Sequence, residues 1–145
     1  MDKNKTYVSL ETAQLLKQAG FDWEGKLAMQ NCKGDWEIYL DGVTHNWNDK
    51  KSAAYKYHLT VPTLDIAQKW LRDVKNCQIE IMYMYDKYGI NLGKYIGIYT
   101  VQDKIHGSLA DEESEKPIKL FEVYEKAQEA LEQKILTILL DEEKK

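Results

Sequence analysis

The sequence predicts an α+β protein, with a small antiparallel sheet of about four to five strands and three helices packed mainly on one face. Two observations lead to this fold class. Apolar residues recur at helical spacing in three segments, and between these segments apolar and polar residues alternate, as they do in half-buried strands. No repeat, linker or change of composition divides the 145 residues, so we expect a single domain over residues 1–145.

The predicted helices are bounded by residues that favour helix ends. Ser9 is a suitable N-cap for a helix over residues 10–19, and Gly20 stands at the left-handed position that follows it. Thr63 and Asn76 bound a second amphipathic helix in the same way. A third helix is expected at about residues 124–140, with a buried stripe of four residues: Ala127, Leu131, Ile135 and Ile138.

Alternation predicts two hairpins. In the first, residues 36–41 form a half-buried strand that pairs with a weaker strand at residues 27–31, across a turn at residues 33–35. In the second, a strand at residues 79–85 pairs with an antiparallel return strand at residues 95–101.

Three further features complete the predicted fold. Gly97 inside a strand indicates a bulge or close packing against a helix. A short strand is possible over residues 55–59, before Pro62. Residues 103–117 are expected to form a loop, and the acidic run at residues 111–115 is most simply a solvated surface.

Charge and cysteine content narrow the classes of function. The net charge of −4 argues against a general binder of nucleic acids or anionic membranes, because such a protein needs a basic face. No apolar run approaches the roughly 20 residues that span a bilayer, and the N-terminal segment lacks the apolar core of a signal peptide. Cys32 and Cys77 lie in no metal or redox spacing, which indicates free thiols in a reducing cytoplasm, with a disulfide as the less favoured alternative.

Three blocks of sequence stand out as a set: VSLETAQLLKQAGFDW at residues 8–23, AQKWLRDV at residues 67–74 and YEKAQEAL at residues 124–131. Together they resemble a group of small uncharacterised proteins of gut Bacteroidetes and their phages or mobile elements. The resemblance implies a shared fold and an origin in a phage or mobile element. It implies no catalytic residues, because none are established for the group.

The reactive side chains form no motif for catalysis or metal binding. His45, His58 and His106 lack the closely spaced His or Cys partners of zinc sites. Cys77 with His58 is the only pair to consider for nucleophilic catalysis, but a cysteine after a helix C-terminus is not activated and is expected to be a small core residue. There is no P-loop, nucleophile elbow or dinucleotide-binding glycine motif. We therefore expect no catalytic residue, cofactor or metal, and keep an enzyme with scattered residues as one alternative.

An aromatic and basic segment at residues 45–58 suggests a second alternative, a small nucleic-acid-binding module. Aromatic rings interleaved with lysines suit stacking on bases and pairing with phosphates. The residues of this candidate surface are Trp47, Lys50, Lys51, Tyr55, Lys56 and Tyr57. The interpretation that we favour is a polar loop whose Trp47 folds back as an anchor, followed by an edge strand that lysines protect from unwanted pairing.

Apolar residues also exceed what one small sheet needs to bury. The strand at residues 79–85 has rings on one side and methionines on the other, and the last helix carries two adjacent leucine-rich stripes. Self-association, most often as a two-fold dimer, would bury this excess, although another part of the same chain could also cover it. The predicted self-association surface consists of Met82, Met84, Leu136, Leu139 and Leu140.

These observations favour a non-catalytic interaction or accessory protein of the cytoplasm. Its expected partner is a second copy of the chain or another protein, with nucleic acid as the less favoured partner and no membrane association.

Overall fold

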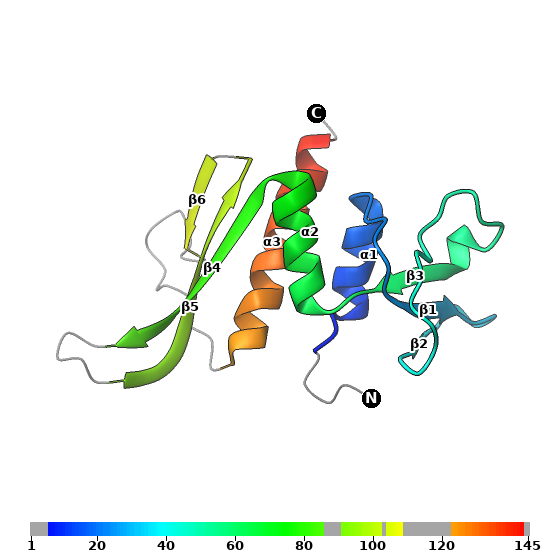
Figure 1. The fold of residues 1–145 in the computed structure, drawn as a ribbon, viewed down its shortest axis with the longest axis horizontal. Helices are drawn as coiled ribbons and strands as arrows, with labels where there is room; N and C mark the ends of the chain where they lie inside the picture. Colours follow the sequence, from blue (N-terminus) through cyan, green and yellow to red (C-terminus); the bar gives the residue numbers. More distant parts are fainter. Residues whose placement is uncertain (1–5, 86–90, 103, 109–122, 144–145) are drawn as a thin grey trace. The chain divides into compact units, whose positions relative to one another are not determined.

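The computed structural model describes residues 6–85, 91–102, 104–108 and 123–143, and within these ranges it leaves out the side chains of residues 84–85, 91–94, 96 and 104–108. The described residues form three helices and two antiparallel sheets, which confirms the α+β class (Figure 1). Each sheet has three strands. The prediction of one sheet with four to five strands is therefore replaced by two smaller sheets: the strands within residues 26–61 pair with one another, and so do those within residues 77–108.

The chain divides into two compact units, which we describe separately. The first unit ends at Trp70 and the second begins at Leu71, so the boundary falls inside helix α2 (Leu64–Lys75). The single domain over residues 1–145 stays a prediction.

The first unit holds helix α1 and a three-stranded sheet. Its elements are α1 (Leu10–Gln18), β1 (Lys26–Gln30), β2 (Trp36–Tyr39), the 3-10 helix η1 (Tyr55–Tyr57) and β3 (His58–Val61). The strand order is β2-β1-β3, so the central strand β1 pairs with both neighbours and β2 is an edge strand. The predicted hairpin over residues 27–41 is thus confirmed, and Ala28 lies opposite both Ile38 and Leu59. Helix α1 packs on β3.

The predicted ends of α1 are confirmed. Ser9 Oγ accepts a hydrogen bond of 3.2 Å from the Thr12 backbone N–H, as an N-cap does. Gly20 has a φ of 96°, and the Phe21 N–H donates to the Leu16 carbonyl at 2.9 Å, which completes a Schellman ending. This ending directs Phe21 into the core, where its ring meets the Trp70 ring edge to face at 5.2 Å.

Helix α2 also begins and ends as predicted. The Thr63 hydroxyl accepts from the Ile66 N–H at 3.2 Å, so Thr63 is its N-cap. Asn76 follows the helix with a φ of 57°, the left-handed conformation that Asn adopts more readily than most residues.

The second unit joins three strands to the last helix. Its elements are β4 (Cys77–Tyr85), β5 (Asn91–Val101), β6 (Lys104–Ser108) and α3 (Tyr124–Glu143), with the strand order β4-β5-β6. The second predicted hairpin is confirmed, and α3 contacts both β4 and β5. Strand β6 lies within the segment predicted to be a loop, so that prediction is wrong for residues 104–108. The acidic run at residues 111–115 lies outside the described residues.

Close packing between β5 and α3 occurs at Gly97, which is the second of the two alternatives that the sequence indicates. A Cβ atom built on Gly97 would lie 2.2 Å from Leu131 Cδ1 and 2.9 Å from Leu131 Cγ. Leu131 is fully buried, together with Ala127 and Ile135 of the predicted stripe. The absence of a side chain at residue 97 therefore allows the helix to approach the strand at this point.

We predict that Gly97→Ala destabilises the protein by about 1–3 kcal/mol, because the new methyl group overpacks a site that Leu131 already fills. Leu131→Ala alone should also destabilise, by about 2–5 kcal/mol, through the cavity that it leaves. The double variant should lose clearly less than the sum of the two, because the small residue at 131 makes room for the methyl group. Denaturant unfolding measures all three values, and strict additivity would contradict the contact.

Candidate interaction surface

Trp47 folds back onto the sheet of the first unit. Its backbone N–H donates to Thr60 Oγ1 at 2.8 Å, and its ring packs edge to face against the rings of His45 and His58, at 5.0 Å and 5.8 Å. The side chain is half-buried, and its indole nitrogen lies out of contact with solvent. Trp47 therefore anchors the loop between β2 and β3 to the sheet, and its ring is not free to stack on a nucleic-acid base.

Tyr55 is engaged by Lys17 of α1. The Lys17 ammonium lies 4.0 Å from the centre of the Tyr55 ring, and it donates to the backbone carbonyls of Tyr55 and His58, the latter at 2.9 Å. Burial lowers the pKa of the Lys17 ammonium. Because a cation already covers one face of the Tyr55 ring, that face is closed to a nucleic-acid base.

The other residues of the predicted nucleic-acid surface are exposed. Lys50, Lys51 and Lys56 face solvent, and Tyr57 is 56% exposed. Tyr55 and Tyr57 lie in η1 and not in the short strand predicted over residues 55–59, which begins only at His58. The predicted nucleic-acid surface is thus smaller than expected, with three exposed lysines and one exposed aromatic ring, that of Tyr57. The nucleic-acid alternative stays a prediction.

Asn48 ties the loop between β2 and β3 to two other segments. Its side chain is buried; Nδ2 donates to the Phe21 carbonyl at 3.0 Å, and Oδ1 accepts from the Thr60 N–H at 3.1 Å. One amide thus satisfies both an acceptor after α1 and a donor in β3. The position of Trp47 depends on this tie, because it is the residue before Asn48.

We predict that Asn48→Ala destabilises the protein by about 2–4 kcal/mol, since it leaves two buried backbone groups without their partner. Ser52→Ala is the matched control: it removes an exposed side-chain acceptor of the same loop and should change stability by less than about 0.5 kcal/mol. Denaturant midpoints of both variants make the comparison. Equal effects would show that the Asn48 bonds do not hold the loop.

The predicted self-association surface is only partly exposed. Met82 in β4 is 44% exposed, whereas Leu136 and Leu139 of α3 are buried, at 0% and 5%. Leu140 is half-buried, and the side chain of Met84 lies outside the described residues. Leu136 and Leu139 therefore belong to the core, because both leucine-rich stripes of α3 are largely covered within the chain.

The β1–β2 hairpin and the turn after it carry the largest set of exposed apolar side chains in the first unit. Their exposed fractions run from 37% to 73%, and the residues are Met29, Ile38, Tyr39, Leu40 and Val43. We call this set the hairpin surface. The sequence predicts a half-buried strand here, and the structure shows β2 to be exposed along most of its length.

The two faces of the hairpin explain this exposure. Ile38 lies on the same face as its partner Ala28, but Ala28 is fully buried whereas Ile38 is 40% exposed. Helix α1 packs on β3, which lies at the opposite edge of the sheet from β2. Tyr39 lies with its partner Leu27 on the opposite face, where its hydroxyl donates to Glu37 at 2.8 Å. Apolar side chains thus emerge from both faces of one edge strand.

Sequence reasoning missed the hairpin surface, although a signal for it was present. The argument applied to residues 79–85, that apolar residues on both sides of a strand need a second cover, applies equally to residues 27–40. The missing information was which strand would lie at the edge.

Each described cysteine has a structural setting of its own. Cys77 is 1% exposed, which confirms its prediction as a core residue, and burial raises the pKa of its thiol. Cys32 is exposed in the turn of the first hairpin, and both cysteines are free. Among the described residues no group of three or more His, Cys, Asp or Glu side chains could hold a metal ion. His45 and His58 pack against Trp47 instead.

We predict that the native protein exposes one thiol to a water-soluble disulfide reagent and that both react after denaturation. Cys32 should react rapidly, whereas Cys77 should wait for unfolding because it is buried and protonated. Cys32→Ser should abolish the rapid phase. A rapid phase that persists in this variant would show that Cys77 is accessible and would revive it as a candidate nucleophile.

Comparisons of the chain with protein-family models, curated proteins and solved structures gave no match. None of the helices in the described residues is both long and apolar enough to cross a membrane.

Proposed function

We propose that this chain is a non-catalytic interaction protein that self-associates through the hairpin surface. The observation that carries the proposal is the edge strand β2, which presents large apolar side chains on both faces. Exposed apolar groups on an edge strand are costly for a protein to keep unless a partner covers them.

A second copy of β2 is the partner that fits this strand most simply. The outer side of an edge strand has backbone N–H and C=O groups that no neighbouring strand of its sheet uses. Two copies of β2 in antiparallel pairing about a two-fold axis would use these groups and join two three-stranded sheets into one of six strands. Ile38 and Tyr39 would then each meet apolar residues of the other copy on their own face.

The magnitude of the gain sets the expected affinity. Burying the exposed part of one such side chain gains on the order of 1 kcal/mol, so ten side chains across a two-fold interface gain on the order of 10 kcal/mol. Association itself costs about 4–15 kcal/mol. The gain exceeds the lower estimates of this cost, and we expect a weak dimer with a dissociation constant in the micromolar range, which dissociates on dilution below it.

The test compares two lysine substitutions at exposed apolar residues of similar exposure, Ile38→Lys on the hairpin surface and Met82→Lys in β4. Sedimentation velocity up to about 200 µM should show a concentration-dependent dimer for the wild type, since a weak dimer forms by mass action. Ile38→Lys should weaken it at least about tenfold, because two ammonium groups would face the interface. Met82→Lys should leave it unchanged.

Two results would contradict the proposal. A wild-type chain that stays monomeric at the highest concentration excludes self-association. Dissociation by Met82→Lys but not by Ile38→Lys would assign the dimer to β4, which is part of the surface that the sequence predicted.

A further inference from the structure

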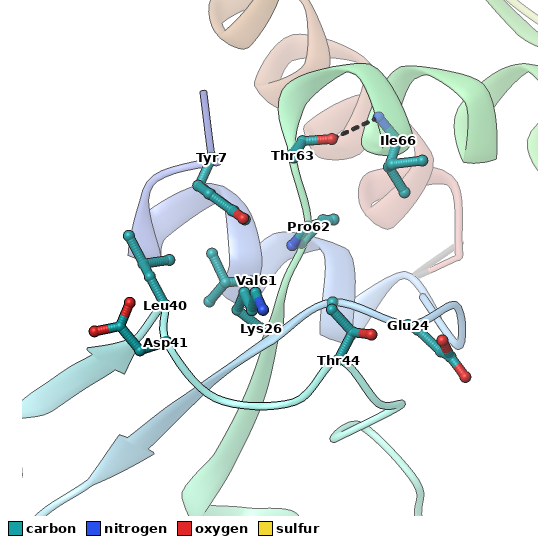
Figure 2. A pocket seen from close by; sticks show the side chains of 11 residues that line it. Tyr7, Glu24, Lys26, Leu40, Asp41, Thr44, Val61, Pro62, Thr63 and Ile66 are labelled. Atoms are coloured by element: carbon teal, nitrogen blue, oxygen red, sulfur yellow. Dashed lines mark hydrogen bonds between the residues drawn. The ribbon is translucent and has the colours of Figure 1, made fainter. Parts of the chain in front are cut away.

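A cleft of about 440 Å³ lies in the first unit, within the size range of small-molecule sites (Figure 2). Four segments surround it: the N-terminal segment at Tyr7, the start of β1, the turn after β2 and the end of β3 with the start of α2. Its lining is of mixed character, with charged, hydroxyl and apolar side chains, and the proposed self-association does not account for it.

Backbone hydrogen bonds hold the walls of the cleft in place. The Val8 N–H donates to the Pro62 carbonyl at 3.0 Å, and the Leu64 N–H donates to the Thr6 carbonyl at 2.9 Å. On the other side, Gly25 and His45 exchange two backbone hydrogen bonds of 3.1 and 3.0 Å. The cleft is therefore largely formed before any ligand arrives, which reduces the ordering cost of binding.

Three charged groups belong to the cleft, one positive and two negative. Figure 2 shows Lys26 near the middle, beside Val61, with Asp41 and Glu24 on opposite sides. The Lys26 ammonium donates to the Gly42 carbonyl at 2.7 Å, a neutral partner that leaves its charge uncompensated. Within the described part of the chain, none of these three groups forms an ion pair with another.

Apolar walls and two hydroxyls complete the lining. Val61 and Pro62 are buried, and Leu40 and Ile66 are partly exposed around the opening. The Tyr7 hydroxyl points toward the space between the walls, and Thr44 contributes a second hydroxyl from the turn after β2 (Figure 2). These walls suit an aliphatic chain of a few carbons, and the hydroxyls suit a polar end group.

We infer that the cleft binds a small ligand with one carboxylate, two cationic groups and an aliphatic stem, which is the chemical class of the basic amino acids. The carboxylate faces Lys26 and the Tyr7 hydroxyl. The two cationic groups lie toward the opposite rims of the cleft, where the exposed Glu24 and Asp41 stand, and the stem lies on the wall formed by Val61 and Pro62. The ligand's charge of +1 matches the −1 sum of the three charged groups.

Other classes of ligand fit less well. A phosphate ester brings two or more negative charges to a cleft with two carboxylates and a single cation. A neutral apolar ligand would cover three charged groups without compensating them.

The test is a titration of the full-length protein, followed by two-dimensional amide NMR, with a matched set of small molecules. L-Lysine and L-arginine should shift the amide signals of the cleft residues and bind about two- to fivefold more tightly than L-norleucine, which lacks the second cation. Cadaverine, which lacks the carboxylate, should bind more weakly by a similar factor. Added salt should weaken the binding of lysine, because exposed charges are screened.

Conservative variants then assign the roles. Asp41→Asn and Glu24→Gln are exposed substitutions that preserve shape, and each should weaken lysine binding about two- to fivefold. The variant of the carboxylate that meets the side-chain cation should leave norleucine binding unchanged, whereas the variant of the carboxylate that meets the α-ammonium should weaken both ligands. Lys26→Gln should weaken every ligand with a carboxylate and leave cadaverine unaffected or bound more tightly. Glu11→Gln, an exposed acid of α1 outside the cleft lining, is the matched control and should leave lysine binding unchanged.

Several results would overturn the inference. Equal binding of lysine and norleucine would exclude recognition of the second cation, and an unchanged affinity in both acidic-group variants would exclude their role. Absence of any shift of cleft amides at about 10 mM ligand would exclude the site, since even weak small-molecule sites saturate there. The titration is repeated on Ile38→Lys, so that binding is judged independently of the oligomeric state.

Discussion

The close approach of Gly25 to the end of β3 is the constraint on which the first unit depends. A Cβ atom at this position would lie 2.6 Å from Thr60 Cγ2 and 2.9 Å from the Val61 carbonyl oxygen. Glycine therefore allows the chain to enter β1 against the backbone of β3 while it pairs with His45 on the far side. This contact sets where β1 begins. Through the two hydrogen bonds to His45 it also positions the loop after β2 and one wall of the cleft.

The loop after the hairpin is fixed by polar groups and aromatic edges more than by apolar burial. Asn48 ties it to the end of α1 and to β3, and Trp47 lies between two histidine rings. These interactions use up the aromatic and amide groups that could otherwise have met a ligand. The first unit still presents the apolar side chains of β2 and the charges of the cleft, beside three exposed lysines and Tyr57.

Local features of the fold could be predicted from the sequence, whereas the placement of strands in sheets could not. Ser9, Gly20, Thr63 and Asn76 act through neighbours within a few positions, so their roles as helix ends follow from the chain itself. Whether Ile38 lies at an edge depends on which strand pairs with β1 on its other side, and this pairing involves residues about thirty positions away. The cleft was invisible for the same reason, because Tyr7, Lys26, Asp41 and Thr63 come from four separate segments.

The contact between Gly97 and Leu131 has a consequence for the order in which the second unit is assembled during synthesis. The ribosome releases β4 and β5 before α3, and the strand face that receives Leu131 waits until the helix has emerged. Over that interval Ile79 and Tyr99, which are buried in the finished protein, lack the cover of α3. Until α3 has emerged, this face of the nascent chain is open to chaperones and to aggregation.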